Sequence, residues 1–374
     1  SYDVHALIVY TSGTTGVPKG VLLSQYNLLV DAQGIGEHHE ATENDMFMCV
    51  LPIHHVNGIL VTLMSPLTVG GSVVLNKRFK TDKFWERIHK EKITITSTVP
   101  TLLAFLVERK EDISKYDLSN LRWLIVAAGP LTVDLATRFE NTFGIRLQHG
   151  YGLSETTCFS SYLPIDLKKE EHDFWMRQNG FPSIGVAIKP NEMAIHDASG
   201  NELGPGKKGE IVIRGKNVMV EYLKRPDANK DTFKHGWFRS GDEGFYLEDE
   251  KVRKFFFITG RIKELIIRGG TNISPLELDE VLNSIQGVKR AIAVGFENKW
   301  YGEEVGACVN LNDGIRMTEE DIINRCAQRL PFFKRPKAVM FVDHIPVTST
   351  GKYQRNKMKH LFEKYKDIQF KEAK

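Results

Sequence analysis

The stretch VYTSGTTGVPKGV, residues 9–21, places three glycines, four threonine or serine side chains and one lysine between an apolar run (5–10) and a helix-like segment (22–33). Glycines let backbone N–H groups approach an anion, hydroxyls add donors, and the start of a following helix adds positive potential. The stretch therefore predicts a phosphate-binding loop, although the GK[ST] of a Walker A motif is absent. A flexible glycine turn is the alternative, but it would not explain four hydroxyls together with Lys19.

Beyond this loop, short apolar runs alternate with segments of helical spacing. Strands are predicted within 93–100, 121–129 and 145–152, and helices within 81–92 and 131–143. This alternation indicates an α/β fold in which a mainly parallel sheet is covered by helices on both faces. Ligands of such sheets bind at the carboxyl ends of the strands, where the glycine-rich segments of this chain lie.

The chain is predicted to have three regions. Residues 1–180 form an α/β part of a large domain, and 181–260 form a β-rich part with antiparallel hairpins. Residues 261–374 form a compact α+β C-terminal domain, whose first helix has a capping box of Ser274 and Glu277 with Pro275 at its first position. The uncharged stretch 56–75 is interrupted by Pro66, Gly70 and Gly71, which predicts a buried helix, a glycine turn and a buried strand rather than a transmembrane segment.

The composition excludes several classes of protein. Fifty basic against 47 acidic side chains leave a net charge of +3, which does not favour nucleic acid or an anionic membrane as a partner. The four cysteines show no CxxC pair and no zinc spacing, so that reduced thiols in a cytoplasmic protein are predicted.

Eight motifs together resemble the adenylate-forming superfamily, which includes acyl-CoA synthetases, aryl-CoA ligases and luciferases. They occur in the family's order, and the resemblance covers nearly the whole chain: YTSGTTGVPKGV (10–21), LPIHHVNG (51–58), AAGPL (127–131), HGYGLSET (149–156), GEIVIRG (209–215), WFRSGD (237–242), TGRIKELIIRGGTNISP (259–275) and PVTSTGKYQRNK (346–357). Family members carry a large N-terminal portion before the phosphate loop, whereas here the loop begins ten residues in. The resemblance thus implies a cleaved product, an expressed part or one half of a split enzyme, with a separate N-terminal polypeptide as one partner.

The resemblance implies ATP, Mg²⁺ and CoA as cofactors and assigns the nucleotide site. Glu155 is the implied magnesium ligand, and Tyr151 stacks on adenine, with core packing as the alternative for Tyr151. Asp242 accepts from both ribose hydroxyls and Arg261 reaches the ribose or phosphate, although an Asp after Gly is also an ordinary turn residue. The remaining contacts to ATP or AMP are assigned to the loop and to two turns: Thr11, Ser12, Gly13, Thr14, Thr15, Gly16, Lys19, Gly129, Gly152 and Ser154.

Other positions are assigned to catalysis and to the second half-reaction. Lys352 contacts the substrate carboxylate and the α-phosphate, although a lysine in such a polar loop is ordinarily exposed. Lys263 matches the hinge about which the C-terminal domain rotates, and Gly269 and Gly270 lie in the segment that opens a channel for the pantetheine thiol. The cluster FFKRPK (332–337) either meets CoA phosphates or forms a solvated basic patch.

The acyl pocket is assigned to His55, Gly58, Pro130 and Leu153, with Gly129 and Gly152 beside them. A single histidine in an apolar run is often a satisfied core residue, but the motif favours a gating or orienting role for His55. No aspartate stands in LPIHHVNG to pair with a substrate amine, so that a fatty or other non-amino acid is predicted, with a preference for aliphatic over aryl acids.

The predicted function is ATP-dependent conversion of a carboxylic acid to acyl-AMP with release of pyrophosphate, followed by transfer to the thiol of CoA. One alternative loads the acyl group on an acyl-carrier protein. Another, from a different class, is a non-catalytic nucleotide-binding or interaction fragment. The presence of Lys19, Glu155, Asp242, Arg261 and Lys352 favours an enzyme.

Overall fold

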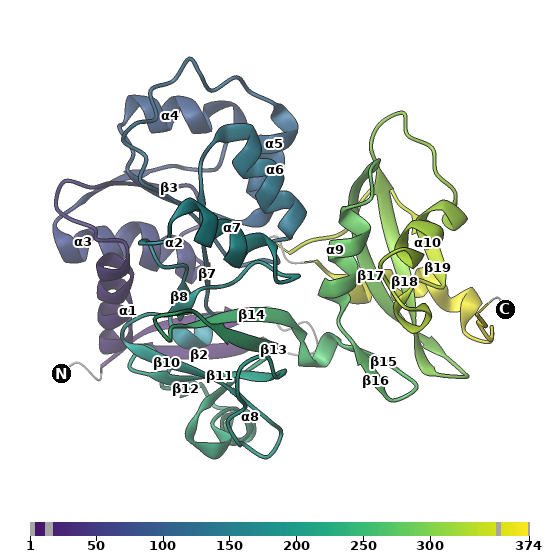
Figure 1. Ribbon diagram of the computed structural model, residues 1–374. Helices are drawn as coiled ribbons and strands as arrows, with labels where there is room; N and C mark the ends of the chain where they lie inside the picture. Colours follow the sequence, from purple (N-terminus) through teal and green to yellow (C-terminus); the bar gives the residue numbers. More distant parts are fainter. Residues whose placement is uncertain (1–3, 12–17, 349–352, 373–374) are drawn as a thin grey trace. The chain divides into compact units, whose positions relative to one another are not determined.

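The computed structural model describes residues 4–11, 18–348 and 353–372 (Figure 1). Two compact units make up the chain. The first takes in the chain up to Leu131, Leu135–Ser240 and Gly244–Ile258, and the second takes in Thr132–Asp134, Gly241–Glu243 and the chain from Thr259.

Seven strands form the main sheet of the first unit, in the order β4–β3–β5–β6–β7–β8–β9. The pairs from β4 to β7 are parallel, whereas β8 and β9 are antiparallel additions after β7. The predicted mainly parallel sheet is therefore confirmed. The strands are β3 (Met46–Cys49), β4 (Ser72–Leu75), β5 (Ile95–Thr98), β6 (Trp123–Val126), β7 (Leu147–Tyr151), β8 (Ser161–Tyr162) and β9 (Val186–Ala187).

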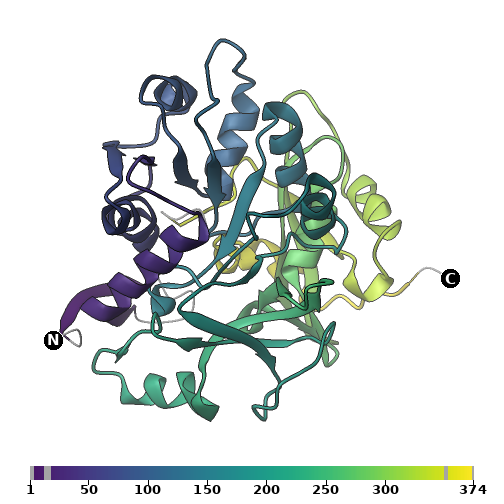
Figure 2. The same ribbon diagram turned by 60° about the vertical axis from the view of Figure 1, so that its left-hand side comes forward.

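Helices cover both faces of this sheet, because alternate side chains of a strand point to opposite sides. Leu124 and Val126 of β6 pack in a core with α4, α5, α6 and α7, whereas Ile125 packs in a second core with α1 and the segment 60–61. Figures 1 and 2 show α1 in purple and the blue helix α4 on different sides of the strands. The helices are α1 (Gln25–His38), α4 (Phe84–Lys90), α5 (Pro100–Arg109), α6 (Val133–Phe143) and α7 (Lys169–Arg177).

The uncharged stretch 56–75 folds as helix, glycine turn and strand. It contains α2 (Val56–Ile59), a π-helical turn η1 (Leu60–Met64) and α3 (Ser65–Val69), which ends at Gly70 with φ +76°. The prediction of a buried strand was wrong in one respect, because β4 lies at the sheet's edge and is partly exposed. Within the part of the chain that the structure describes, no helix is both long and apolar enough to cross a bilayer.

Two further sheets are antiparallel, and they combine strands of the predicted β-rich part with β1 and β2 from the start of the chain. One joins β1 (His5–Thr11), β2 (Lys19–Ser24) and β12 (Glu221–Tyr222). The other has the order β10–β11–β13–β14, and its β10–β11 pair confirms the predicted hairpin. Their bounds are β10 (Asn191–His196), β11 (Gly209–Gly215), β13 (Phe238–Glu248) and β14 (Lys254–Arg261), with α8 (Pro226–Thr232) and the short helix η4 (Lys234–Gly236) between β12 and β13.

The second unit is an α+β fold around one sheet, in which β19 pairs with β18. Its elements are β15 (Ile266–Arg268), β16 (Thr271–Ile273), α9 (Pro275–Asn283), β17 (Val288–Asn298), β18 (Gly302–Leu311), α10 (Glu319–Ala327), β19 (Ala338–Phe341) and η7 (Arg355–Tyr365). Ser274 caps α9 by accepting from the backbone N–H of Glu277 at 3.4 Å, as predicted. A capping box also predicts that the Glu277 carboxylate accepts from the backbone N–H of Ser274. This part of the prediction was wrong, because the carboxylate accepts from Lys334 Nζ at 2.6 and 2.8 Å instead.

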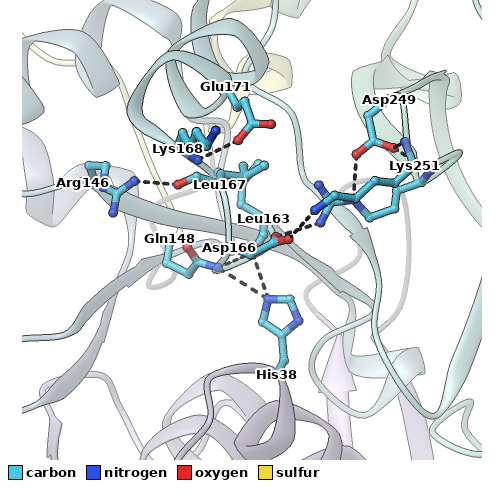
Figure 3. A network of polar contacts seen from close by, with 11 residues as sticks. His38, Arg146, Gln148, Leu163, Asp166, Leu167, Lys168, Glu171, Asp249 and Lys251 are labelled. Atoms are coloured by element: carbon cyan, nitrogen blue, oxygen red, sulfur yellow. Dashed lines mark hydrogen bonds and ion pairs between the residues drawn. The ribbon is translucent and has the colours of Figure 1, made fainter.

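A polar network fixes the segment that follows β8 (Figure 3). The backbone oxygen of Leu163 lies 2.8 Å from Nε2 of His38 in α1 and accepts from Gln148 in β7. Asp166 forms ion pairs with Lys251 at 3.0 Å and with Arg253 at 2.8 Å. The network thus joins α1, β7 and the β13–β14 turn.

Glu140 of α6 is a buried carboxylate that holds β7 in place. Its oxygens accept from the backbone N–H of Leu147 at 2.9 Å and lie 2.8 Å from His172 Nε2 and 2.5 Å from Arg177 Nη2. Burial alone would raise the pKa of Glu140, but the contacts with His172, Leu147 and Arg177 outweigh it and lower the pKa below 4.5. A depressed carboxylate pKa stabilises the fold above pH 4.5, and this stability is lost as the pH falls through the folded-state pKa.

Replacing Glu140 by glutamine should lower the free energy of unfolding at pH 7 by about 1–3 kcal/mol, because it removes charge-assisted bonds from a buried site. Urea unfolding followed by tryptophan fluorescence measures this loss, which should shrink as the pH is lowered below 4.5. Glu86→Gln is the control, since the ion pairs of Glu86 join it to the exposed side chains of Lys83 and Lys90. A pH-independent loss in Glu140→Gln, or an equal loss in Glu86→Gln, would contradict this account.

Candidate active site

The stems of the predicted phosphate loop form a two-stranded ribbon. Thr11 ends β1 and pairs with Lys19, the first residue of β2, and the Thr11 hydroxyl donates to the backbone oxygen of Lys19 at 3.4 Å. Five loop positions lie outside the described residues, as does Lys352, and their assigned roles stay predictions: Ser12, Gly13, Thr14, Thr15 and Gly16.

Three side chains from distant parts of the sequence meet beside this ribbon. Lys19 Nζ lies 3.8 Å from the centre of the Tyr222 ring, a cation–π contact, and the Tyr222 hydroxyl donates to Glu155 Oε1 at 2.7 Å. Tyr222 belongs to β12, which pairs with β2. The predicted phosphate-binding lysine and the predicted magnesium ligand are therefore connected through a tyrosine.

Glu155 stands in a tight turn at the carboxyl end of β7. The turn begins with the short helix η3 (Ser154–Thr156), where Leu153 N donates to the Thr156 hydroxyl at 3.0 Å and Thr157 N donates to the backbone oxygen of Ser154 at 3.1 Å. Thr157 has φ +63°, which is strained for a β-branched residue. Such strain persists only where neighbouring contacts over-determine the backbone.

Gly152 allows this turn to close. A Cβ at position 152 would fall 1.7 Å from the backbone oxygen of Cys158 and 2.5 Å from the Cα of Phe159. Tyr151, the last residue of β7, is 7% exposed and packs in an apolar cluster that also contains Tyr222. Its position agrees with the core-packing alternative, and the adenine-stacking role stays a prediction.

The AAGPL turn follows β6 at the same edge of the sheet as the turn after β7. Ala128 has φ +64°, and a Cβ on Gly129 would touch Pro100 Cδ at 3.4 Å. Gly129 and Pro130 are partly exposed, whereas Ala127 is buried. Both turns follow adjacent parallel strands. Each contains a non-glycine residue with positive φ, Ala128 or Thr157, together with residues that are partly exposed.

The predicted acyl-pocket segment lies at the start of α2. His55 is the residue before the helix, and its ring centre lies 4.3 Å from that of His54. Gly58 is buried, and a Cβ there would come within 2.5 Å of the backbone oxygen of Pro52, so that this glycine is required for packing. Asn57 is 6% exposed and accepts from the Ser97 hydroxyl at 2.8 Å, whereas its Nδ2 has no hydrogen-bond partner among the described residues.

In the second unit, Asp242 and Arg261 contact each other. Arg261 Nε lies 2.7 Å from Asp242 Oδ1, and the Asp242 side chain is 4% exposed. Arg261 thus contacts the carboxylate to which the ribose was assigned, and the ribose roles of both residues stay predictions. Lys263 is exposed in the short helix η5 (Ile262–Glu264).

Gly269 and Gly270 form the turn between β15 and β16, with φ +54° and +82°. Gly269 N donates to the backbone oxygen of Tyr301 at 2.8 Å. Both glycines are exposed. Their role in a CoA channel stays a prediction.

The prediction of a solvated basic patch for the FFKRPK cluster was wrong, because its cations contact groups of the second unit. A contact of this cluster with CoA phosphates stays a prediction. Lys337 is 8% exposed, and its Nζ donates to the backbone oxygens of Phe332 and Arg335 at 2.6 and 2.7 Å. Burial lowers the pKa of Lys337 to about 8. Lys334 pairs with Glu277 at 2.6 Å, and Arg335 Nε donates to the backbone oxygen of Leu330.

The side chains near Glu155 suit a magnesium ion that is held mainly by a single carboxylate and by the phosphates of the nucleotide. No group of three or more His, Cys, Asp or Glu side chains able to hold a metal occurs among the residues that the structure describes. Magnesium does not need such a group, because it is usually held by one or two carboxylates, waters and substrate phosphates. Glu155, next to the stems of a phosphate loop, fits that requirement.

Comparison with known proteins identifies the family. The AMP-binding enzyme model matches residues 3–223, and the AMP-binding enzyme C-terminal domain matches 277–352. The chain is 36% identical to an oxalate–CoA ligase of Arabidopsis thaliana, covering 97% of this chain and 68% of that protein. It is 35% identical to a sulfoacetate–CoA ligase of Cupriavidus necator, covering 95% and 67%.

Solved structures of enzymes with a similar fold support the same family assignment. ATP-bound MatB from Rhodopseudomonas palustris superposes with a TM-score of 0.87 at 29% identity, covering 97% of this chain and 69% of that one. An o-succinylbenzoate CoA synthetase from Bacillus subtilis, in complex with its acyl-adenylate, gives 0.83 at 29% identity, covering 100% and 71%. The chain spans about two thirds of the length of its relatives.

The chain belongs to the AMP-binding enzyme family, and within it to the ATP-dependent acid–CoA ligases. These enzymes form an acyl-adenylate and pass the acyl group to CoA, with ATP, Mg²⁺ and CoA as their cofactors. The resemblance seen in the sequence is confirmed.

Several residues of the site were not predicted from the sequence. Asn57 stands in the segment LPIHHVNG, whereas Tyr222 lies outside the eight motifs, and nothing in their spacing distinguishes either residue. Asp31 and Asn217 are fully buried polar residues that contact the turn bearing Glu155. The one available signal was a carboxylate, Asp31, in the otherwise uncharged stretch 25–36 that forms most of α1.

Gly152→Ala should reduce the affinity for an ATP analogue at least about 10-fold, because the added Cβ would force the turn after β7 apart. Isothermal titration calorimetry measures this loss. Gly204→Ala is the matched control, since a Cβ at position 204 meets nothing within 4 Å. Unchanged binding by Gly152→Ala would show that this turn does not hold the nucleotide.

Proposed function

We propose that this chain adenylates a small organic acid that carries a second polar or acidic group, and then transfers it to CoA. The observation that supports the site assignment is the contact of Lys19, Tyr222 and Glu155 beside the stems of the glycine-rich loop. A lysine for phosphate, a carboxylate for the metal and a tyrosine that orients the carboxylate are the groups that phosphoryl chemistry needs.

In the proposed reaction, a carboxylate oxygen of the acid attacks the α-phosphorus of ATP. The bond between that phosphorus and the bridging oxygen to the β-phosphate breaks, and pyrophosphate leaves. The thiol of CoA, on losing its proton, then attacks the acyl carbon of the mixed anhydride and AMP leaves. Negative charge accumulates in both steps, so that fixed cations and donors supply most of the stabilisation.

The three side chains that meet beside the phosphate ribbon each have a role in this scheme. Lys19 neutralises the outer phosphates. Glu155 holds Mg²⁺, which when bound offsets the charge of the phosphates. The Tyr222 hydroxyl, at 2.7 Å from Glu155 Oε1, fixes the direction of the carboxylate. A carboxylate has about four lone-pair positions, so that this bond leaves room for a metal.

Two observations support a polar acid rather than a fatty chain. Relatives with 36% and 35% identity include ligases that are named for oxalate and sulfoacetate, each of which has two acidic groups. The buried Nδ2 of Asn57 has no partner among the described residues, and an unpaired buried donor costs about 1–3 kcal/mol. An oxygen of a polar acid would satisfy it, whereas an alkyl chain would not.

The names of the relatives and the state of the cysteines bear on the acceptor and on the setting of the reaction. CoA is favoured over an acyl-carrier protein because the relatives are named as CoA ligases. The four cysteines are unpaired and buried, which suits a reducing compartment such as the cytoplasm. The separate N-terminal polypeptide and the mobility of the second unit stay predictions.

Pyrophosphate exchange across a panel of acids tests the function. We expect exchange with oxalate, sulfoacetate or another short acid with two polar groups, and at least about 10-fold less with hexanoate. Asn57→Leu should narrow this difference, because it removes the polar group that we assign to the acid. Faster exchange with hexanoate would contradict the proposed substrate class, and no exchange with any acid would support the non-catalytic alternative.

Lys352→Ala should lower the rate of adenylation about 10²–10³-fold, because it removes a cation assigned to the forming acyl-phosphate bond. Thioester formation from a preformed acyl-adenylate should be retained. Pyrophosphate exchange measures the first half-reaction and thioester release the second. Exchange at the wild-type rate would exclude this role for Lys352.

A further inference from the structure

Four segments of the first unit meet at a buried polar junction behind Glu155. The segments are β2, the helix α1 that follows it, the turn 154–159, and the residues between β11 and β12. Asn217 and Asp31 lie at its centre, and both side chains are fully buried. Neither residue takes part in the proposed reaction scheme.

The amide of Asn217 holds the turn by its backbone. Its Nδ2 donates to the backbone oxygen of Phe159 at 2.9 Å and to that of Thr156 at 3.3 Å, and also to Asp31 Oδ1 at 3.0 Å. The backbone oxygen of Asn217 accepts from the hydroxyl of Thr157 at 2.6 Å. Asn217 therefore forms hydrogen bonds with three residues in the second half of the turn, Thr156, Thr157 and Phe159. The remaining residue, Cys158, lies between two of them.

Asp31 completes the restraint from α1. Its Oδ2 accepts from the backbone N–H of Phe159 at 3.3 Å. Four residues earlier on the same helix face, Asn27 donates to the backbone oxygens of Lys216 and Val218 at 2.7 and 3.0 Å. Asn217 is thus held on both sides by α1.

The same helix is joined to the phosphate ribbon. Ser24, the last residue of β2, accepts from Asn27 N at 3.1 Å and donates its own N–H to Asn27 Oδ1 at 2.9 Å. Beyond the junction, Met219 N donates to the backbone oxygen of Glu155 at 2.8 Å, and Tyr222 follows in β12. Lys19, Glu155 and Tyr222 are therefore all attached to one polar core.

We infer that Asn217 and Asp31 are positioning residues for the magnesium–nucleotide site: they fix the backbone of the turn 154–159 so that the Glu155 carboxylate faces the metal. The strained φ of +63° at Thr157 supports this role, because the turn would relax without outside restraint. Second partners of metal ligands typically account for 10–100-fold in metal affinity. The inference rests on the proposed role of Glu155.

The test compares three variants of the protein by calorimetric titration with ATP in the presence of Mg²⁺. Asn217→Ala removes the amide, and Asp31→Asn replaces the carboxylate acceptor with a group of the same size. Asn76→Ala is the matched control, because Asn76 is also a buried amide that donates to two backbone oxygens, those of Cys49 and Val74, away from the turn. Thermal unfolding establishes that each variant is folded, and Asp31→Asn serves alone should Asn217→Ala fail to fold.

We expect both junction variants to bind Mg²⁺–ATP about 10-fold more weakly and to need about 10-fold more Mg²⁺ for half-maximal pyrophosphate exchange. The KM for the acid and the rate of thioester formation from preformed acyl-adenylate should each change less than about 2-fold. General destabilisation of the protein would change both of them as well. Wild-type Mg²⁺ dependence in folded junction variants, or the same losses in Asn76→Ala, would overturn the inference. A wild-type protein that binds Mg²⁺–ATP without exchange would instead refute the proposed function, and the binding titration would still decide the inference.

Discussion

The hydrogen bonds of one buried amide, that of Asn217, are the constraint on which the site depends. This side chain donates to the backbone at Thr156 and Phe159 and to the carboxylate of Asp31, and all of these groups are shielded from water. In a low-dielectric interior such bonds are strong and their loss is costly, because the acceptors would be left unpaired. The turn after β7 therefore takes one conformation, and the direction of Glu155 follows from it.

A rigid turn matters here because the chemistry depends on charge rather than on covalent catalysis. Fixed donors stabilise developing negative charge without having to reorganise during the reaction. Lys19 and Glu155 come from segments 136 positions apart, yet Tyr222 contacts both of them. In the second unit, the Asp242–Arg261 pair shows the same principle, since the arginine holds a buried carboxylate in one orientation.

Much of the fold could be predicted from the sequence because the parallel strands are short, apolar and separated by clear helical periods. The errors came where tertiary contacts override local signals. The apolar composition of β4 predicts burial, yet the strand is at an edge. Glu277 fits a capping box, but Lys334 offers its carboxylate a charged partner. The basic run 332–337 is compatible with a solvated patch, but Lys337 turns inward to backbone oxygens. Motifs located Lys19 and Glu155, whereas Asp31, Asn217 and Tyr222 gain their roles only through contacts between distant segments.

The most direct measurement is a crystal structure of the protein with a non-hydrolysable ATP analogue and Mg²⁺. We expect a metal ion about 2.1 Å from a carboxylate oxygen of Glu155, with the analogue's phosphates beside Lys19 and the hydrogen bonds of Asn217 unchanged. A nucleotide bound away from the turn 154–159, or a metal held without Glu155, would contradict it.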